Sequence, residues 1–268
     1  MMIDETHDPA RKSWVESANG HADFPIQNLP LGVFSRDGDS PRGGMAIGDM
    51  ILDLSALALS GLLDGEALAA ASAANGATLN PMLALGTGPR RALRKRVSAL
   101  LSEGAAGKVQ VESLLMPMRE AQMHLPAHVG DYTDFYVGIH HATNIGSLFR
   151  PDNPLLPNYK HVPIGYHGRA STIRATGADV IRPQGQTKAP TADAPSFGPI
   201  AKLDYELELG VWMATGNDLG SPIPIASITL PASLCSTTGR HGISRRGNTS
   251  RWAPSSPRTS FPPCRLGS

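Results

Sequence analysis

Residues 131–150 carry an unusual density of side chains that can do chemistry. The segment reads DYTDFYVGIHHATNIGSLFR and holds two carboxylates, two tyrosines, adjacent histidines, an amide and an arginine. Its aliphatic side chains larger than alanine are only Val137, Ile139, Ile145 and Leu148. A helix or strand of the core would fill most of its inward positions with apolar side chains. We therefore interpret this segment as one wall of a polar active site.

A second group of carboxylates lies in residues 203–211, which read LDYELELGV. Strict alternation predicts a strand with apolar side chains on one face and Asp204, Glu206 and Glu208 on the other. Side chains on one face follow each other at about 6.5–7 Å, so these carboxylates repel one another unless a cation lies between them. The face is either an exposed acidic edge or a divalent cation site held by Glu206 and Glu208. Oxygen-only ligands favour Ca²⁺ or Mg²⁺ over zinc.

The polar residues of the first segment each allow two interpretations. Asp134 is a further oxygen ligand or the cap of a turn, and Tyr136 shares its side if the chain is extended. Neighbours on a strand point to opposite faces, so at most one of His140 and His141 enters the site, as a general base. Arg150 faces solvent or binds a substrate carboxylate through two hydrogen bonds.

The elements that position these residues are punctuated by Gly and Pro. Residues 45–54 predict a hairpin that turns at Gly48-Asp49, and residues 57–74, rich in Leu and Ala, predict a helix. A second helix is expected from Pro89, with Thr87 as a possible N-cap. Its apolar stripe consists of Leu93, Val97, Leu100 and Leu101. Residues 202–213 predict a strand.

Five basic residues of that second helix suggest a nucleic-acid patch. They are Arg90, Arg91, Arg94, Lys95 and Arg96. No aromatic residues lie between them, so a solvated helix face is the better interpretation. We expect no nucleic-acid partner.

Composition restricts the classes of protein to which the chain can belong. With 268 residues and 41% hydrophobic content, the chain can form one large domain or two small ones. No apolar run approaches the roughly eighteen residues of a membrane span, and the polar N-terminus lacks a secretory signal. We expect a soluble, cytoplasmic protein. The two cysteines, Cys235 and Cys264, lie in residues 229–268, which hold six arginines and no acidic residue.

These segments, in this order, closely resemble the fumarylacetoacetase family of carbon–carbon bond hydrolases. The matching pieces are FPIQNLPLGVF, AIGDMILDL, DYTDFYVGIHHATNIGSLFRP, PNYKHVPIGYHGRAST, RPQGQ and KLDYELELGVWMATGNDLGSPIPI. They extend over about residues 24–225. The blocks DYTDFY, HATN and YHGRAS are the most specific.

The resemblance implies a role for each candidate residue. Cation ligands, for Ca²⁺ or Mg²⁺, are expected at Asp134, Glu206 and Glu208. Substrate contacts are expected at Tyr136, Arg150 and Tyr166. The general base that activates water is expected at His141 and not at His140. The implied reaction splits 4-fumarylacetoacetate into fumarate and acetoacetate, the last step of tyrosine and phenylalanine degradation.

The resemblance also implies an α+β, mainly β fold and a homodimer. We expect a flexible arm over residues 1–22, a small SH3-like β domain with helices over residues 23–126, and the first portion of a β-rich catalytic domain over residues 127–228. Residues 229–268 depart from the family and are expected to be disordered, because they show no apolar periodicity.

The departure has a simple explanation at the level of DNA. The family continues with a block reading roughly Asn-Asp-Trp-Ser-Ala-Arg-Asp-Ile-Gln. Residues 237–244, TTGRHGIS, can be encoded by bases that read Asp-Trp-Ser-Ala-Arg-Asp-Ile when two bases are skipped. We therefore expect a frameshift after about Ile228 and a truncated catalytic domain. That block supplies another metal-ligating Asp, so we expect this chain to be inactive, and unstable or aggregation-prone.

Two other functions are open. One is another enzyme of the broader superfamily that acts on 2-oxo acids such as acylpyruvates, which an assay of those acids would detect. The other is a non-catalytic, truncated partner of an intact enzyme, which co-purification would detect.

Overall fold

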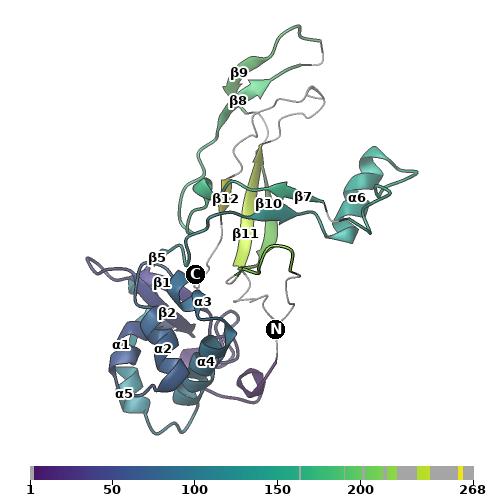
Figure 1. Cartoon of the computed structure of the whole chain (residues 1–268). Helices are drawn as coiled ribbons and strands as arrows, with labels where there is room; N and C mark the ends of the chain where they lie inside the picture. The colour runs from purple at the N-terminus through teal and green to yellow at the C-terminus, as the bar shows by residue number, and fades with distance from the viewer. Residues whose placement is uncertain are drawn as a thin grey trace.

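The computed structural model describes residues 3–162, 164–189, 191–200, 203–213, 216–221, 234–241 and 259–261. Helices and antiparallel strands are mixed along the chain (Figure 1), which confirms the expected class at the level of α+β. Residues up to about 127 form one packed unit, and the described residues after it form hairpins, helical segments and a separate sheet. In the described ranges no helix is both long and apolar enough to cross a bilayer.

A five-stranded antiparallel sheet organises the N-terminal unit in the order β4-β3-β2-β1-β5. Its strands are β1 Leu31–Ser35, β2 Arg42–Ile47, β3 Met50–Asp53, β4 Leu115–Pro117 and β5 Gln122–His124. The β2–β3 connection is the hairpin that the sequence predicts, since Ile47 pairs with Met50 around Gly48-Asp49. Gly48 has a positive φ of 54° and lies against Ser17, so a side chain there would be strained and would overlap the N-terminal segment.

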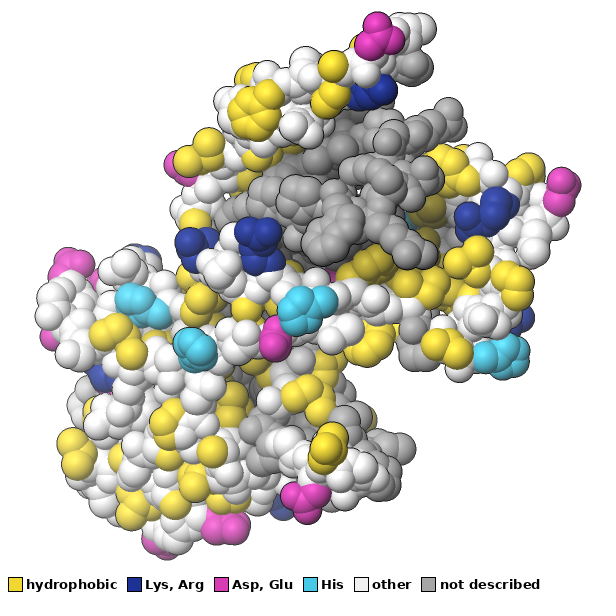
Figure 2. Space-filling model, turned by 45° about the horizontal axis from the view of Figure 1, so that its top comes forward, with side chains coloured by type: hydrophobic (Ala, Val, Ile, Leu, Met, Phe, Trp, Pro, Cys, Tyr) yellow, Lys and Arg dark blue, Asp and Glu magenta, His cyan; other side chains and the backbone are white. Residues whose placement is uncertain are grey.

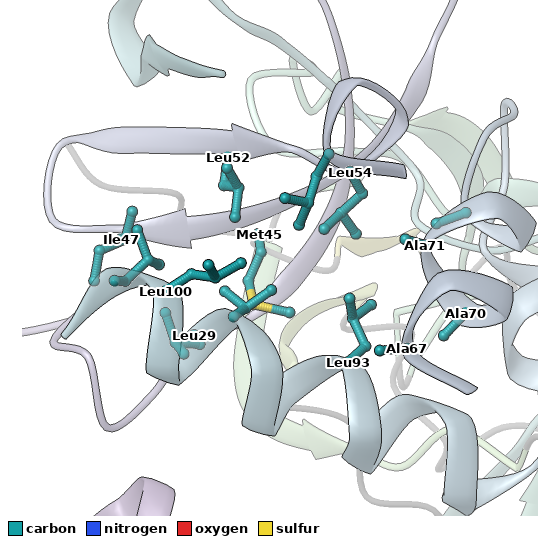
Figure 3. Close-up of a cluster of buried hydrophobic side chains, with 14 of the residues drawn as sticks. Leu29, Met45, Ile47, Leu52, Leu54, Ala67, Ala70, Ala71, Leu93 and Leu100 are labelled. Atoms are coloured by element: carbon teal, nitrogen blue, oxygen red, sulfur yellow. The ribbon is translucent and has the colours of Figure 1, made fainter. Parts of the chain in front are cut away.

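Helices pack on this sheet and form the core of the unit. They are α1 Leu54–Leu59, α2 Gly65–Ala73, α3 Asn80–Ala84, α4 Thr87–Leu101 and α5 Lys108–Glu112, with short 3₁₀ turns η1 Glu5–His7, η2 Glu16–Ala18 and η3 Met118–Glu120. Figure 3 shows Leu93 of α4 beside Ala67 of α2, with Met45 and Leu52 reaching in from the sheet. The small alanines let α2 and α4 approach closely. The predicted stripe of α4 is confirmed, because its four apolar residues are buried.

Two helix boundaries differ from the predictions. The single helix expected over residues 57–74 is interrupted between α1 and α2, where Gly61 adopts a positive φ of 74° that a continuous helix does not allow. Thr87 is the first residue of α4 and not its cap, since Gly86 occupies the N-cap position without a side-chain hydrogen bond. Pro89 is accordingly the third residue of the helix, where its missing N–H is still harmless.

We expected the basic face of α4 to be solvated. Part of it instead contacts other residues of the chain. Arg94 donates hydrogen bonds to the Thr6 hydroxyl and to the carbonyl oxygens of Gln27 and Asn28. Lys95 pairs with Glu5 at 2.8 Å. Residues 3–22, expected to be a loose arm, are held against α4 by these contacts and by the buried residues Thr6, Ser13, Val15 and Ala18.

Beyond residue 127, the described residues form three small antiparallel sheets. They are the pair β6 Thr133–Phe135 and β7 Gly165–His167, the pair β8 Gln184–Thr187 and β9 Ser196–Pro199, and the sheet β10 Leu203–Gly210, β11 Leu234–His241 and β12 Thr259–Phe261. Helix α6 Ile139–Phe149 follows β6, and η4 Ala170–Thr172 follows β7. In Figure 1, α6 and the β8–β9 hairpin project away from the N-terminal unit. Trp212, after β10, packs against the core of that unit.

Strand β10 confirms the strand expected near residues 202–213. Strands β11 and β12 lie in the stretch for which we expected disorder, and they pair antiparallel with β10 and with each other. The rest of that stretch lies outside the described residues, so its disorder stays a prediction.

Candidate functional site

The β6–β7 hairpin places two of the predicted site residues directly opposite each other. Asp134 pairs with Tyr166 in the antiparallel register. The ladder continues at both ends, because Tyr136 N–H donates to the Ile164 carbonyl at 2.8 Å and Gly168 N–H donates to the Tyr132 carbonyl at 2.9 Å. Side chains of directly opposite residues lie on one face, with Cβ atoms about 4.5–5.5 Å apart. The carboxylate and the phenol therefore belong to one surface.

Burial alternates along this hairpin and identifies its inner face. The half-buried residues are Tyr132, Asp134, Tyr136, Ile164 and Tyr166. The residues between them are exposed: Thr133, Phe135, Val137, Gly165 and His167. The prediction that Tyr136 shares the side of Asp134 is thus confirmed. His167 forms an ion-pair contact with Asp131 at 3.4 Å, and both are exposed, so this pair lies apart from the inner face.

The adjacent histidines lie on a helix and not on a strand. Both belong to the first turn of α6, which begins after Gly138. The ring of His141 meets the ring of Tyr136 edge-to-face, with centroids 5.5 Å apart and planes at 87°. Successive residues of a helix point about 100° apart, so His140 is directed elsewhere. The expected strand geometry of the two histidines was wrong, and the entry of only one of them, His141, into the site stays a prediction.

Helix α6 was missed because its buried face is made of small residues. Its buried residues are Ala142 and Gly146, not large aliphatic ones. A Cβ on Gly146 would overlap the carbonyl group of Pro154, so the turn after the helix approaches it closely. Small residues at helical spacing are the signal that could have identified it.

Arg150 lies at the far end of α6 from His141. It is exposed, and its guanidinium donates to the Pro154 carbonyl at 3.2 Å. Nine residues of helix correspond to about 13.5 Å along the axis. The structure therefore brings Asp134, Tyr136, Tyr166 and His141 together, but it separates Arg150 from the histidine by roughly the length of the helix.

Glu206 and Glu208 occupy alternate positions of β10, opposite Thr238 and Ser236 of β11. Residues two apart on a strand share a face. Their side chains lie outside the described part of the structure, so their distance from Asp134 is not defined. Among the described side chains, no group of three or more His, Cys, Asp or Glu residues is arranged to hold a metal ion.

One tyrosine on the inner face and one beside it were not among the predicted site residues. Tyr132 shares the alternation of Asp134 and Tyr136, and this pattern could have identified it. Its ring lies so close to Gly168 that a Cβ there would overlap it. Tyr159 belongs to the turn before β7, and its ring meets Tyr136 edge-to-face with centroids 6.2 Å apart. No local sequence pattern indicated that contact.

Comparison with known proteins places these motifs in a family. Residues 27–126 match the family model described as fumarylacetoacetase N-terminal. The chain is 49% identical over 225 residues to a fumarylacetoacetase of Caenorhabditis elegans, which covers 80% of this chain and 52% of the relative. Identity to the fumarylacetoacetase of Oryza sativa is 44% over 234 residues (84% and 54%), and to that of Homo sapiens 44% over 212 residues (76% and 50%). The chain spans about half the length of the curated relatives it matches.

Proposed function

The chain belongs to the fumarylacetoacetase family, and from this premise we propose that residues 131–208 contribute to a site that hydrolyses a carbon–carbon bond of 4-fumarylacetoacetate. The products are fumarate and acetoacetate, and the reaction ends tyrosine and phenylalanine degradation. The observation that carries the proposal is the convergence of Asp134, Tyr136, Tyr166 and His141 on one hairpin and the helix that follows it.

The donor set suits a hard cation. Asp134, Glu206 and Glu208 offer only carboxylate oxygens, which Ca²⁺ and Mg²⁺ prefer. Asp134 is half-buried on the inner face of the hairpin. We propose that these three residues hold the ion. When bound, it supplies Lewis-acid polarisation of a substrate carbonyl and stabilisation of developing negative charge.

We propose His141 as the general base. The imidazole takes a proton from a water molecule, and the water oxygen forms a bond to the carbonyl carbon next to the scissile bond. The carbon–carbon bond then breaks, its electron pair leaves with the acetoacetate fragment, and a proton completes that product. The edge-to-face contact with Tyr136 favours one orientation of the imidazole ring.

The remaining side chains bind the substrate. Tyr136 and Tyr166 present phenol hydroxyls on the inner face, where they can donate to substrate oxygens. We propose that Arg150, at the other end of α6 from His141, binds a carboxylate of the substrate that lies away from the reacting carbonyl. We propose these contacts on the family resemblance and on the half-buried positions of the two tyrosines.

The family resemblance supports three further proposals about the whole protein. The N-terminal unit corresponds to the SH3-like domain of the family, for which the five-stranded antiparallel sheet is suitable. The protein forms a homodimer. It resides in the cytoplasm.

An ion-binding experiment tests the site without relying on turnover. Asp134→Asn should weaken Ca²⁺ binding to the full chain by about tenfold or more, because a carboxylate ligand is lost. Asp131→Asn, three residues earlier and on the exposed face, is the matched control and should leave the affinity unchanged. Isothermal titration calorimetry measures both. Equal affinities in the two variants would remove Asp134 from the ligand set.

We also propose that this chain does not turn over substrate by itself. Residues 229–268 contain no acidic residue, so they cannot provide the further aspartate ligand that the family block supplies. Loss of the diketone absorbance above background, with the full chain and Ca²⁺ or Mg²⁺, would refute this. Sequencing the DNA that follows the codon for Ile228 tests its proposed cause, because a frameshift leaves the Asp-Trp-Ser-Ala-Arg-Asp reading in another frame.

One observation favours the second candidate, a non-catalytic partner of an intact enzyme. Helix α6 exposes Leu148 and Phe149, at 75% and 65%, and an exposed apolar face favours association. Co-purification of the full chain with a full-length relative would support this role. Aggregation of the full chain in the presence of that relative would exclude it.

A further inference from the structure

Two sets of contacts connect the N-terminal unit to the rest of the chain. In the first, Leu79 N–H donates to the Pro126 carbonyl at 2.7 Å. The Asn80 side chain there accepts from His128 N–H at 2.7 Å and donates to the His128 carbonyl at 3.2 Å. In the second, Trp212 packs against the large core cluster of the unit. Among the described residues after residue 127, it is the one hydrophobic side chain that does so.

Both sets of contacts lie close in sequence to the proposed ion ligands. Asp134 follows His128 by six residues, and Glu208 of β10 precedes Trp212 by four. A fully extended chain spans about 3.6 Å per residue, so Asp134 lies within about 22 Å of the first contact and Glu208 within about 14 Å of the second. Without Trp212, Glu208 would be connected to the first contact through roughly eighty residues, and the entropic cost of closing a loop rises with its length.

The exposure of neighbouring side chains distinguishes Trp212 from the chain around it. Trp212 is half-buried, whereas Val211 and Met213 on either side are 47% and 51% exposed. An indole ring buries more apolar area than most side chains, so a single tryptophan contributes a strong contact. The contact therefore holds the chain that follows β10 at the surface of the N-terminal unit.

We propose that Trp212 is a positioning residue for the divalent cation site. Its ring attaches the end of β10, and with it Glu206 and Glu208, to the unit from which the segment of Asp134 also starts. The segments that carry the three carboxylates are thus restrained before the ion binds. Such preorganisation raises affinity without adding a contact to the ligand, because less conformational entropy is lost on binding. The inference rests on the proposed function, since it takes the ion and its ligands from there.

The test compares Trp212→Ala with Trp14→Ala in the full chain by calorimetry with Ca²⁺. Trp14 is also half-buried and packs against the same core cluster, but it lies in the N-terminal segment. Trp212→Ala should weaken Ca²⁺ binding about tenfold, because the effective concentration of tethered groups falls as the tether lengthens. Trp14→Ala should change the affinity by less than about twofold, since distant sites act independently. Trp212→Phe, which keeps an apolar ring, should restore most of the affinity. Equal effects of the two alanine changes, or no rescue by Trp212→Phe, would overturn the inference.

A second measurement separates this inference from the proposed function. If the unmutated chain does not bind Ca²⁺, the proposed ion site fails, and amide hydrogen exchange then decides the role of Trp212. Exchange in β10 should become about tenfold faster in Trp212→Ala, because the strand loses its attachment, while exchange in β1 of the N-terminal unit stays unchanged. Unchanged exchange in β10 overturns the attachment. Equally faster exchange in β1 also overturns it, because the change then lowers the stability of the whole chain.

Discussion

Leucines of helices α4 and α6 lie in opposite environments. Leu93 and Leu101 of α4 are 0% exposed, whereas Leu148 of α6 is 75% exposed. The same contrast holds for the regions that contain them. The N-terminal unit has a large contiguous cluster of buried residues, while the buried apolar residues described after residue 127 are only Ala142 and Ile200. Figure 2 shows hydrophobic side chains at the surface of the α6 region, on the right of that view.

The difference follows from how strands are combined. Five strands of the N-terminal unit share one sheet, and helices cover it. The strands β6 to β9 form two isolated pairs, and a two-stranded hairpin is marginally stable by itself. The candidate site lies on these weaker elements. The N-terminal unit thus accounts for most of the stability, whereas the candidate site lies after residue 127. Each of the following predictions tests this contrast.

The largest expected effect is a core truncation. Leu93→Ala should destabilise the protein by about 3 kcal/mol, because it leaves a cavity between α4 and α2. Leu148→Ala, the same change on α6, should alter the unfolding free energy by less than about 0.5 kcal/mol. Urea unfolding followed by circular dichroism measures both. Similar losses in the two variants would mean that α6 is packed as α4 is, and the contrast would fail.

The next effect concerns the N-terminal segment. Arg94→Met should cost about 2 kcal/mol, since it removes hydrogen bonds from a charged donor to Thr6 and to two backbone carbonyls. The matched control is Arg36→Met, whose exposed pair with Glu120 at 3.0 Å is worth less than about 1 kcal/mol. Comparable losses in urea unfolding would show that the hydrogen bonds of Arg94 stabilise the unit no more than an exposed ion pair does.

A third change tests the close contact between Gly146 of α6 and the turn that follows the helix. Gly→Ala within a helix usually stabilises it by about 0.5–1 kcal/mol, but the Cβ of Gly146→Ala would overlap Pro154. We expect amide exchange in α6 to become about tenfold faster. Ser147→Ala, next to it and exposed, should instead slow exchange slightly through helix propensity. Slower exchange in both variants would mean that the turn after α6 does not pack against it.

The predictable features were those with a local cause. The hairpin at Gly48 and the stripe of α4 follow from turn chemistry and from helical periodicity. The alternation of exposed and half-buried side chains around Asp134 also has a local cause. Helix α6 was not recognised, because Ala142 and Gly146 do not form the aliphatic stripe that periodicity detects.

Features that depend on distant residues could not be predicted. From the sequence alone, Arg94 cannot be told from a solvated residue, because its partners Thr6 and Asn28 are distant along the chain. In the same way, Tyr159 meets the hairpin through its ring contact with Tyr136, twenty-three residues earlier. Spacing along the chain carries no information about such contacts.

The smallest expected effect is a pH dependence confined to the N-terminal unit. Burial raises the pKa of Asp4, but hydrogen bonds from the Thr6 hydroxyl and amide and the neighbouring His7 outweigh it, so the pKa lies below its usual value of 3.8. A carboxyl whose pKa is lowered by folding stabilises the folded state above its unfolded pKa. That contribution is lost as the pH falls below about 4 and through the folded pKa.

Asp4→Asn should therefore flatten the dependence of the unfolding free energy on pH below about 4, while the amide oxygen still caps η1. Asp37→Asn, in an exposed turn, removes one carboxyl outside this network and is the control. Urea unfolding at closely spaced pH values measures both slopes. If the slope changes equally in the two variants, the network around Asp4 is not formed in solution. Residues 3–7 would then be as weakly held as the exposed helix α6, and the contrast between the two regions would begin after the N-terminal segment.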